Sequence, residues 1–191
     1  MPGPRGLRVL SLAPTSFFAD YGCHVRILEE ALALQRAAAR VSVLTYRKGG
    51  PAPGVHIIRT NPTPWRAEYE VGSSRHKYAF DVLLAIRLLR VLAAARRAGD
   101  PYHVIHGHLH EGALIGGVVG RLFGVPTVMD YQGSLTDEMR QHKFLRPDGK
   151  RERFWRRIET IAERAAGAIV TSTQHAADRM RTAHPGKYVA A

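Results

Sequence analysis

Cysteine is nearly absent from this chain, since Cys23 is the single residue of its kind. One cysteine excludes an intramolecular disulfide, so nothing in the sequence argues for an oxidising compartment. Residues 1–10 combine a short apolar run with Arg8 and have no small-residue cleavage site, which argues against a secretory signal peptide. We therefore expect a cytoplasmic location.

Long apolar runs are also missing. The most apolar helical stretch, near residues 78–92, contains Arg87 and Arg90 and is too short and too charged to span a bilayer. The composition is 45% hydrophobic, 23% charged and 8% aromatic, which is typical of a globular protein. A length of 191 residues fits one domain of ordinary size.

Acidic residues are scarce relative to basic ones. Sixteen Asp and Glu face 28 Lys and Arg, and the net charge is +12. This excess predicts an acidic partner, such as an anionic lipid surface, a nucleic acid or a phosphate-bearing substrate. An arginine bias that arises from base composition explains it equally well. The sequence shows no recognition helix and no basic groove with interleaved aromatic residues, so we expect no nucleic-acid partner.

Apolar runs of strand length alternate with stretches of helical periodicity along the whole chain. This alternation predicts an α/β fold with a doubly wound, mostly parallel Rossmann-like sheet and helices on both faces. The expected strands are residues 7–13, 41–46, 55–60, 103–106, 126–131 and 168–171. The expected helices are residues 22–38, 74–98, 111–123, 148–165 and 174–182.

The turn between the first strand and the first helix is a candidate ligand site. Gly22 opens the helix, where free backbone amides and the helix dipole favour a phosphate group. We assign Tyr21, Gly22 and His24 to substrate binding. The turn lacks the G-x-G-x-x-G pattern, so it is not identified as a dinucleotide site. A plain turn in which Gly22 only relieves strain is the alternative.

Histidine recurs at alternate positions after the fourth expected strand, as His106, His108 and His110. On a continued strand the three imidazoles would share one face and resemble a zinc site, with Glu111 nearby. Gly107 is expected to end the strand, so the alternation should fail after His106. We therefore expect no metal site and assign His110 and Glu111 to substrate hydrogen bonding or to the start of the next helix. Three further glycines are expected to pack that helix closely on a strand: Gly116, Gly117 and Gly120.

Polar residues also follow the fifth expected strand. Asp130, Gln132 and Glu138 can bind sugar hydroxyls, and Gly133 allows a close backbone approach. Ser134 is at the same time suited to cap a short helix. Both interpretations can hold together.

A basic helix with aromatic residues is expected around residues 150–158. Its composition is typical of an interfacial helix on an anionic membrane. A solvated helix with Trp155 and Ile158 turned to the core explains it nearly as well. The residues expected to contact the membrane are Arg151, Arg153, Trp155, Arg156 and Arg157.

The order of these motifs resembles the N-terminal domain of family 4 glycosyltransferases of the GT-B fold. The resemblance covers essentially the whole chain and rests on Gly22 and on residues 104–108, 125–133 and 168–172. It implies sugar transfer from a nucleotide-sugar donor with retention of configuration, without a metal or other cofactor. This domain would bind the glycan, lipid or small-molecule acceptor, and a second Rossmann domain would hold the nucleotide.

Several site residues carry over by position from this resemblance. Gly22 corresponds to a glycine whose amide faces the donor phosphate, and His108 to the histidine at the end of the fourth strand. Gln132 and Gly133 stand where many members have His-Gly, with the histidine beside the reacting sugar. We assign His108, Gln132 and Asp130 as catalytic.

The chain departs from the family pattern at two positions. Tyr21 replaces the first of a frequent glycine pair, and Gln132 replaces the histidine. No cationic or proton-transferring group is therefore available at position 132. A glutamine can still donate and accept hydrogen bonds to a sugar hydroxyl.

We assign residues 1–183 to the Rossmann-like domain and residues 184–191 to the start of a linker that begins another strand. No second domain follows in this sequence. Because GT-B enzymes align their substrates by closing two domains, we expect little transfer until a donor domain is supplied in cis or in trans. The alternative is a non-catalytic binding subunit that associates with a separate donor-domain chain or with a membrane surface.

Overall fold

The computed structural model describes residues 6–19, 22–62, 77–141, 144–145, 147 and 149–191. Seven strands form one sheet in the order β3-β2-β1-β4-β5-β6-β7, and every pair is parallel. The strands are β1 (Arg8–Ala13), β2 (Arg40–Thr45), β3 (His56–Arg59), β4 (Val104–His108), β5 (Thr127–Tyr131), β6 (Ala168–Thr171) and β7 (Tyr188–Ala190). The strand order reverses between β1 and β4, which confirms the doubly wound topology.

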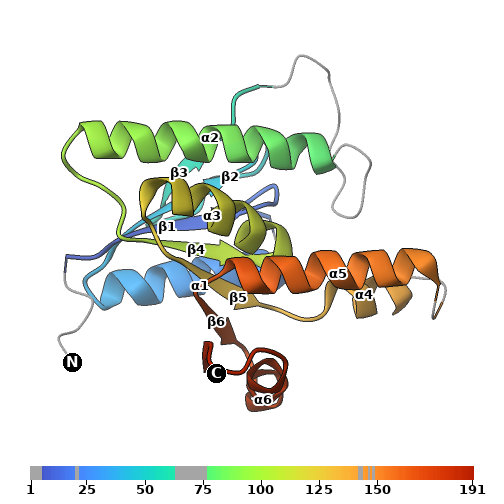
Figure 1. Cartoon of the computed structure of the whole chain (residues 1–191). Coiled ribbons are helices and arrows are strands. Elements are labelled where there is room, and N and C mark those ends of the chain that lie inside the picture. The colour runs from blue at the N-terminus through green and yellow to red at the C-terminus, as the bar shows by residue number, and fades with distance from the viewer. Residues whose placement is uncertain (1–5, 20–21, 63–76, 142–143, 146, 148) are drawn as a thin grey trace.

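Helices cover both faces of this sheet. Figure 1 shows α2 and α3 on one face and α1 on the other. The helices are α1 (Gly22–Arg36), α2 (Lys77–Arg97), α3 (Leu109–Phe123), α4 (Leu135–Gln141), α5 (Lys150–Ala165) and α6 (Gln174–Ala183). Residues 74–76, which the sequence assigns to the second helix, lie outside the described residues.

Alternation along β1 separates two parts of the core. Leu10 and Leu12 pack toward α2 and α3, whereas Val9 and Ala13 pack toward α1. Such alternation follows from the two-residue period of a strand, and burial of both faces explains why β1 has hardly a polar residue. The exceptions are Arg8 at the start of the strand and Ser11, which lies on the α1 face and is buried.

The fourth strand is longer than the sequence predicts. β4 continues to His108, which is in register with Asp130 of β5. The expectation that Gly107 ends the strand is wrong, because Gly107 instead makes room for the next helix. A Cβ atom at Gly107 would lie 2.7 Å from the backbone of Gly112 in the first turn of α3. His106 and His108 therefore share one face of the sheet, while His110 belongs to α3.

Close packing of the glycines in α3 is confirmed. A Cβ atom at Gly116 would lie 3.0 Å from side-chain carbons of Ile105 and Thr127, and one at Gly117 would lie 2.5 Å from the carbonyl oxygen of Ala165 in α5. The helix thus lies against β4 on one side and against α5 on another. This contact fixes α5, and with it the short helix α4, beside the carboxyl end of β5.

The end of the described chain joins the same sheet. Tyr188 and Val189 pair in parallel with Ala168 and Ile169 of β6. Val189 is buried among residues of β6 and α6, so this short strand contributes to the core of the domain. Across the described residues, no helix combines the length and the apolar character needed to cross a membrane.

Candidate functional site

A buried polar network joins the carboxyl ends of β4 and β5. The Nδ1 atom of His108 lies 3.0 Å from Oδ2 of Asp130, and the Nε2 atom of His108 lies 2.7 Å from Oγ of Ser11 in β1. Both His108 and Asp130 have no exposed surface. Two of the three residues that sequence analysis assigns as catalytic, His108 and Asp130, are therefore in contact with each other and buried.

Arg26 of α1 completes this network from the helix that covers it. Its Nε and Nη2 atoms donate to Oδ1 of Asp130 at 3.0 Å and 2.6 Å, and Nη2 is also 2.9 Å from Oε1 of Glu30. Burial alone would raise the pKa of Asp130, but hydrogen bonds from His108, Arg26 and Gln132 hold it well below its usual range. Asp130 is therefore an ionised acceptor that orients the groups around it.

Sequence analysis did not single out Arg26, Glu30 or Ser11. Arg26 and Glu30 are four residues apart on the helix that opens at Gly22, so they share a face with buried Ile27 close by. A charged pair on the buried side of an amphipathic helix and a lone serine in an apolar strand are the signals that could have identified them.

His106 is the second histidine of this network. Its ring centroid lies 4.5 Å from that of His108, and its Nε2 atom lies 3.7 Å from Oε2 of Glu30. Burial, aided by the neighbouring His108, lowers the pKa of His106 to about 3, so the ring is neutral at physiological pH. Glu30, His106 and His108 have the composition of a metal-binding group, but Nδ1 of His108 is engaged by Asp130.

The rim of the same edge is accessible. Gly22, Gly133 and Glu138 are exposed and Gln132 is partly exposed. Gln132 donates from Nε2 to Oδ2 of Asp130 at 2.6 Å, so the buried network fixes a side chain at the surface. Gly133 has a φ of 144°, a conformation that side chains disfavour.

Glu138 lies on α4, near the beginning of α1. Burial raises the pKa of Cys23, and the carboxylate of Glu138 adds to this increase. The hydroxyl of Ser134 accepts a hydrogen bond from the backbone N–H of Asp137 at 3.2 Å, which confirms the predicted cap of a short helix. Tyr21, the remaining predicted residue of this rim, lies outside the described residues.

His24 is placed behind the rim. Its Nε2 atom lies 2.5 Å from Oγ1 of Thr15, and its Nδ1 atom accepts from the backbone N–H of Ala19 at 2.9 Å. The side chain is buried, and burial lowers its pKa. His24 thus holds the turn that precedes α1 and presents Gly22.

His110 and Glu111 point away from the network. Glu111 forms an ion pair with Lys77 of α2, close to Asp81. His110 is buried against α5, with Nε2 3.5 Å from Oε1 of Glu159. Both residues lie in the first turn of α3, as the alternative interpretation of the sequence expects.

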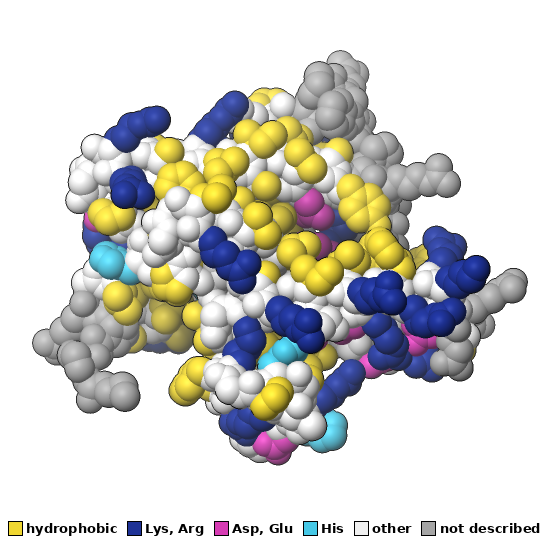
Figure 2. All heavy atoms as spheres, viewed as in Figure 1, with side chains coloured by type: hydrophobic (Ala, Val, Ile, Leu, Met, Phe, Trp, Pro, Cys, Tyr) yellow, Lys and Arg dark blue, Asp and Glu magenta, His cyan; other side chains and the backbone are white. Residues whose placement is uncertain are grey.

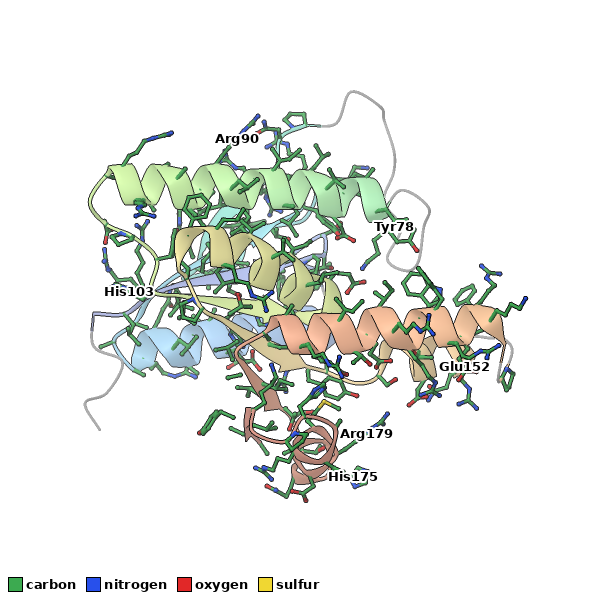
Figure 3. The ribbon with its side chains drawn as sticks, in the orientation of Figure 1. Tyr78, Arg90, His103, Glu152, His175 and Arg179 are labelled. Carbon is green, nitrogen blue, oxygen red and sulfur yellow. The ribbon has the colours of Figure 1, made fainter. Side chains whose placement is uncertain are left out.

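The basic helix α5 packs Trp155 against α2 and leaves its arginines exposed. Trp155 is half-buried and stacks on Tyr78 of α2, with ring centroids 6.4 Å apart. Figure 3 labels Tyr78 at the beginning of α2. Arg156 pairs with buried Glu152 at 2.8 Å. The remaining arginines of the set and Phe154 are exposed, and Figure 2 shows basic side chains along α5 beside an apolar surface between α5 and α2. The exposed large apolar side chains of α2 and α5 are Tyr78, Val82, Ile86, Phe154 and Ile161.

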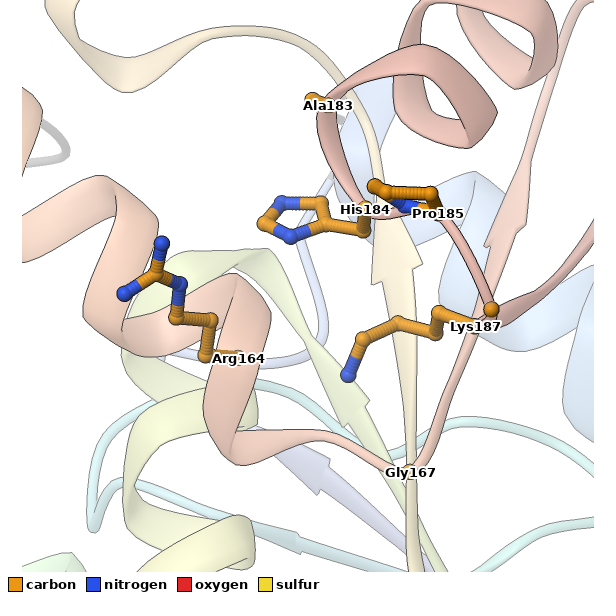
Figure 4. A pocket seen from close by; sticks show the side chains of 7 residues that line it. Arg164, Gly167, Ala183, His184, Pro185 and Lys187 are labelled. Atoms are coloured by element: carbon orange, nitrogen blue, oxygen red, sulfur yellow. The ribbon is translucent and has the colours of Figure 1, made fainter.

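A separate pocket lies at the opposite edge of the sheet. It is bordered by the residues before β6 and by the turn between α6 and β7, as Figure 4 shows. Its lining residues are Arg164, Gly167, Ala183, His184, Pro185, Gly186 and Lys187. It is therefore distinct from the rim formed by Gly22 and Gln132.

Comparison with solved structures places this fold among glycosyltransferases. Sucrose-phosphate synthase from Thermosynechococcus elongatus matches with a TM-score of 0.66 and 14% identity, over 96% of this chain and 47% of that chain. The apo structure of UGT2 from Phytolacca americana matches with a TM-score of 0.64 and 12% identity, over 97% and 51%. MurG from Acinetobacter baumannii matches with a TM-score of 0.55 and 14% identity, over 96% and 44%. The chain thus spans about half the length of these proteins.

The sequence itself identifies the family. No protein with a curated description matches it. The family model described as a glycosyl transferase 4-like domain matches residues 21–189, which is most of the chain and includes both strand ends of the network. The chain therefore belongs to the glycosyl transferase 4-like domain family and has the Rossmann-like fold of one domain of a GT-B glycosyltransferase.

Proposed function

We propose that this chain is the acceptor-binding half of a retaining glycosyltransferase that moves a sugar from a nucleotide-sugar donor to a glycan, lipid or small-molecule acceptor. The observation that carries the proposal is the rim at the carboxyl edge of the sheet. There, Gly22 and Gly133 expose backbone, and Gln132 is held in place from below by Asp130. Ligands of open α/β sheets bind at this edge, beside the point where the strand order reverses.

Gln132 is the residue proposed to touch the reacting sugar. Its amide nitrogen donates to Asp130, which leaves the amide oxygen to accept a hydrogen bond from a sugar hydroxyl. His108 and Asp130 are fully buried, so they act through Gln132 and through the position of β5. Glu138 on the same rim is a second acceptor for hydroxyl groups.

The first turn of α1 is proposed to face the donor phosphates. Gly22 is exposed, and a Cβ atom at this position would meet nothing within 4 Å. A phosphate can therefore approach the free amides of the helix, where the dipole also favours negative charge. Neutralisation by these amides requires no metal ion.

A second domain is proposed to complete the enzyme, in cis or in trans. The structures that resemble this chain are about twice its length. The structure of HepE from Anabaena, which also resembles it, is described as a complex with UDP and glucose. Domain closure positions donor and acceptor together, and such positioning supplies much of the rate of bimolecular transfer.

The test compares the 191-residue chain with the same chain joined to, or mixed with, a donor domain of its family. Sugar-nucleotide hydrolysis and transfer are measured with a panel of nucleotide sugars in the presence of lipid vesicles. We expect activity only when a donor domain is present. Activity of the 191-residue chain alone would contradict the proposal of a half-enzyme.

A non-catalytic role at a membrane surface is the second candidate function. The exposed arginines of α5 beside Phe154 and the apolar surface toward α2 favour it. Anionic lipid attracts such a surface, while exposed aromatic and aliphatic side chains enter the headgroup region. Inactivity of both preparations, together with binding to anionic vesicles, would favour this role over catalysis.

A further inference from the structure

A second buried cluster of titratable side chains lies between α3 and α5, apart from the Asp130 network. It consists of His110 in the first turn of α3 and of Glu159 and Glu163, one turn apart on α5. All three are at least 90% buried, with exposed fractions of 5%, 7% and 6%. Two carboxylates and an imidazole thus lie within the protein interior, where unpaired charge is costly.

The three side chains converge on a common point. The Nε2 atom of His110 lies 3.5 Å from Oε1 of Glu159 and 3.8 Å from Oε1 of Glu163, and one donor atom from each residue lies within 4.8 Å of the others. Two ligand atoms that bind one zinc ion at about 2.1 Å lie roughly 3.4 Å apart at a tetrahedral angle. The spacing is thus longer than a good hydrogen bond and close to that of atoms sharing an ion.

The Nε2 atom of His110 is too far from both carboxylates for a good hydrogen bond. This atom is buried and has no hydrogen bond within the part of the chain that the structure describes, although it faces both carboxylates. More than nine in ten buried polar groups in proteins are satisfied, so an unsatisfied imidazole nitrogen aimed at two carboxylates needs an explanation. A bound cation would satisfy this nitrogen and both oxygens together.

The outer oxygens of the two glutamates are already held. Oε2 of Glu159 accepts from Oγ1 of Thr136 at 2.6 Å, and Oε2 of Glu163 lies 2.7 Å from Nε2 of His184. Each glutamate therefore turns its other oxygen toward His110. Outer hydrogen bonds of this kind orient the ligands in metal sites.

The negative charge of the two carboxylates also favours a bound cation. Within the described part of the chain, the ion pairs of Glu159 and Glu163 involve only the histidines His110 and His184. Glu152, another buried glutamate of α5, is instead neutralised by Arg156 at 2.8 Å. Among the described residues, Glu159 and Glu163 thus have no permanently charged partner of the kind that Arg156 provides for Glu152.

We propose that His110, Glu159 and Glu163 bind one divalent transition-metal ion, with zinc as the best match. A mixed imidazole and carboxylate set suits zinc, and three protein ligands leave a position for water. The ion joins the start of α3 to the middle of α5. We assign it a structural role, because all three ligands are buried whereas Gln132 at the rim is partly exposed.

The test uses the full 191-residue chain without a histidine tag, after treatment with a chelator. Binding of zinc is measured by calorimetry and by metal analysis after dialysis, and Co²⁺ serves as a spectroscopic probe. We expect one equivalent of zinc per chain, a higher Tm with zinc, and the absorption spectrum of four-coordinate Co²⁺ with nitrogen and oxygen ligands. Absence of stoichiometric binding would overturn the proposal.

Variants separate this site from adventitious binding at surface histidines. His110→Ala and Glu159→Gln should weaken zinc binding by more than 100-fold, and His184→Asn by about 10- to 100-fold, as for other outer hydrogen-bond partners. The matched controls are His175→Ala, an exposed histidine on α6, and Glu152→Gln, a buried glutamate of the same helix. Unchanged affinity in His110→Ala would also overturn the proposal. If a variant does not fold, the Co²⁺ spectrum of the wild-type chain still shows whether nitrogen and oxygen ligands coordinate the ion, and a spectrum of hydrated Co²⁺ would overturn the proposal.

Discussion

His108 and Asp130, which are in register on neighbouring parallel strands, lie with Nδ1 and Oδ2 3.0 Å apart and have no exposed surface. Their contact links the two strand ends from which the rim of the site extends. Arg26 binds the same carboxylate from α1, so three elements meet at one buried charge. The network therefore serves both the stability of the sheet edge and the position of Gln132.

The substitution Asp130→Asn should destabilise the fold by about 2 to 4 kcal/mol. It removes the buried carboxylate that binds Arg26 and His108 and leaves the guanidinium its ion pair with Glu30, and losing one partner of a buried ion pair costs on this order. Urea unfolding at neutral pH measures the change. Asp100→Asn is the control, because the ion pair of Asp100 with Arg40 is exposed and should matter little. Equal effects of the two substitutions would contradict a special role for Asp130.

Asp81 should produce a distinctive dependence of stability on pH. Burial raises its pKa to about 6, although Lys77 and the hydroxyl of Tyr46 act in the opposite direction. An unfolded aspartate titrates near pH ~3.9, so the folded state binds more protons between these two values. The contribution of Asp81 to stability therefore decreases as the pH rises from about 4 to 6, by up to roughly 3 kcal/mol.

The contribution of Asp81 must be measured as the difference in unfolding free energy between wild type and a variant, because His106 changes stability with pH in the opposite direction. The folded pKa of His106 is lowered to about 3, so the folded state binds fewer protons and this contribution is lost as the pH falls below about 6.5. We expect the stability of wild type relative to Asp81→Asn to fall between pH 4 and pH 7 in urea titrations. A constant difference across that range would show that Asp81 titrates normally.

Close packing between α3 and α5 predicts that Gly117→Ala destabilises the protein by about 1 to 3 kcal/mol. The added methyl group would lie 2.5 Å from the carbonyl oxygen of Ala165, so one backbone must move. Gly167→Ala is the matched control, since its methyl group would meet a backbone oxygen at 3.6 Å, an ordinary contact. Thermal unfolding compares the two variants, and similar Tm values would argue against the tight helix contact.

Most of the fold could be predicted from the sequence, because buried strands and the turns between them have strong local signals. The runs around Leu10 and Val43 are apolar on both faces, and proline or glycine residues that end strands follow them. The end of β4 could not be placed in this way. Gly107 has a low strand propensity, but it is required by contact with Gly112, which is a tertiary requirement.

The position of the candidate site at the sheet edge was predictable, but the burial of His108 and Asp130 was not. Polar residues after two apolar strands predict a common edge, and the register of His108 with Asp130 agrees with that. The sequence does not reveal that α1 covers these residues, because burial at the edge depends on how Arg26 reaches across the sheet. Long-range contacts of this kind have no local pattern.

Membrane association through α5 predicts a charge-dependent affinity for anionic vesicles. The double substitution Arg151→Glu with Arg153→Glu should weaken binding at least 10-fold, since each basic residue near an anionic surface contributes about 1 kcal/mol. Arg36→Glu, an exposed arginine at the end of α1, is the control for charge change elsewhere. Vesicle sedimentation measures the affinity. Equal weakening by Arg36→Glu would indicate a diffuse charge effect instead of a docking surface.

Gln132 connects the buried network to the proposed reaction, and its removal should affect activity more than stability. In the presence of a donor domain, we expect Gln132→Ala to lower kcat/KM about 10- to 100-fold, because a fixed hydrogen-bond partner of the sugar is lost. The unfolding free energy should fall by less than about 1.5 kcal/mol, because Asp130 keeps its bonds to Arg26 and His108. Gln174→Ala is the control, because it removes the same side-chain amide from an exposed glutamine on α6, and it should change neither quantity. If Gln132→Ala instead lowers stability as much as Asp130→Asn while activity per folded molecule is unchanged, Gln132 belongs to the scaffold and does not contact the sugar.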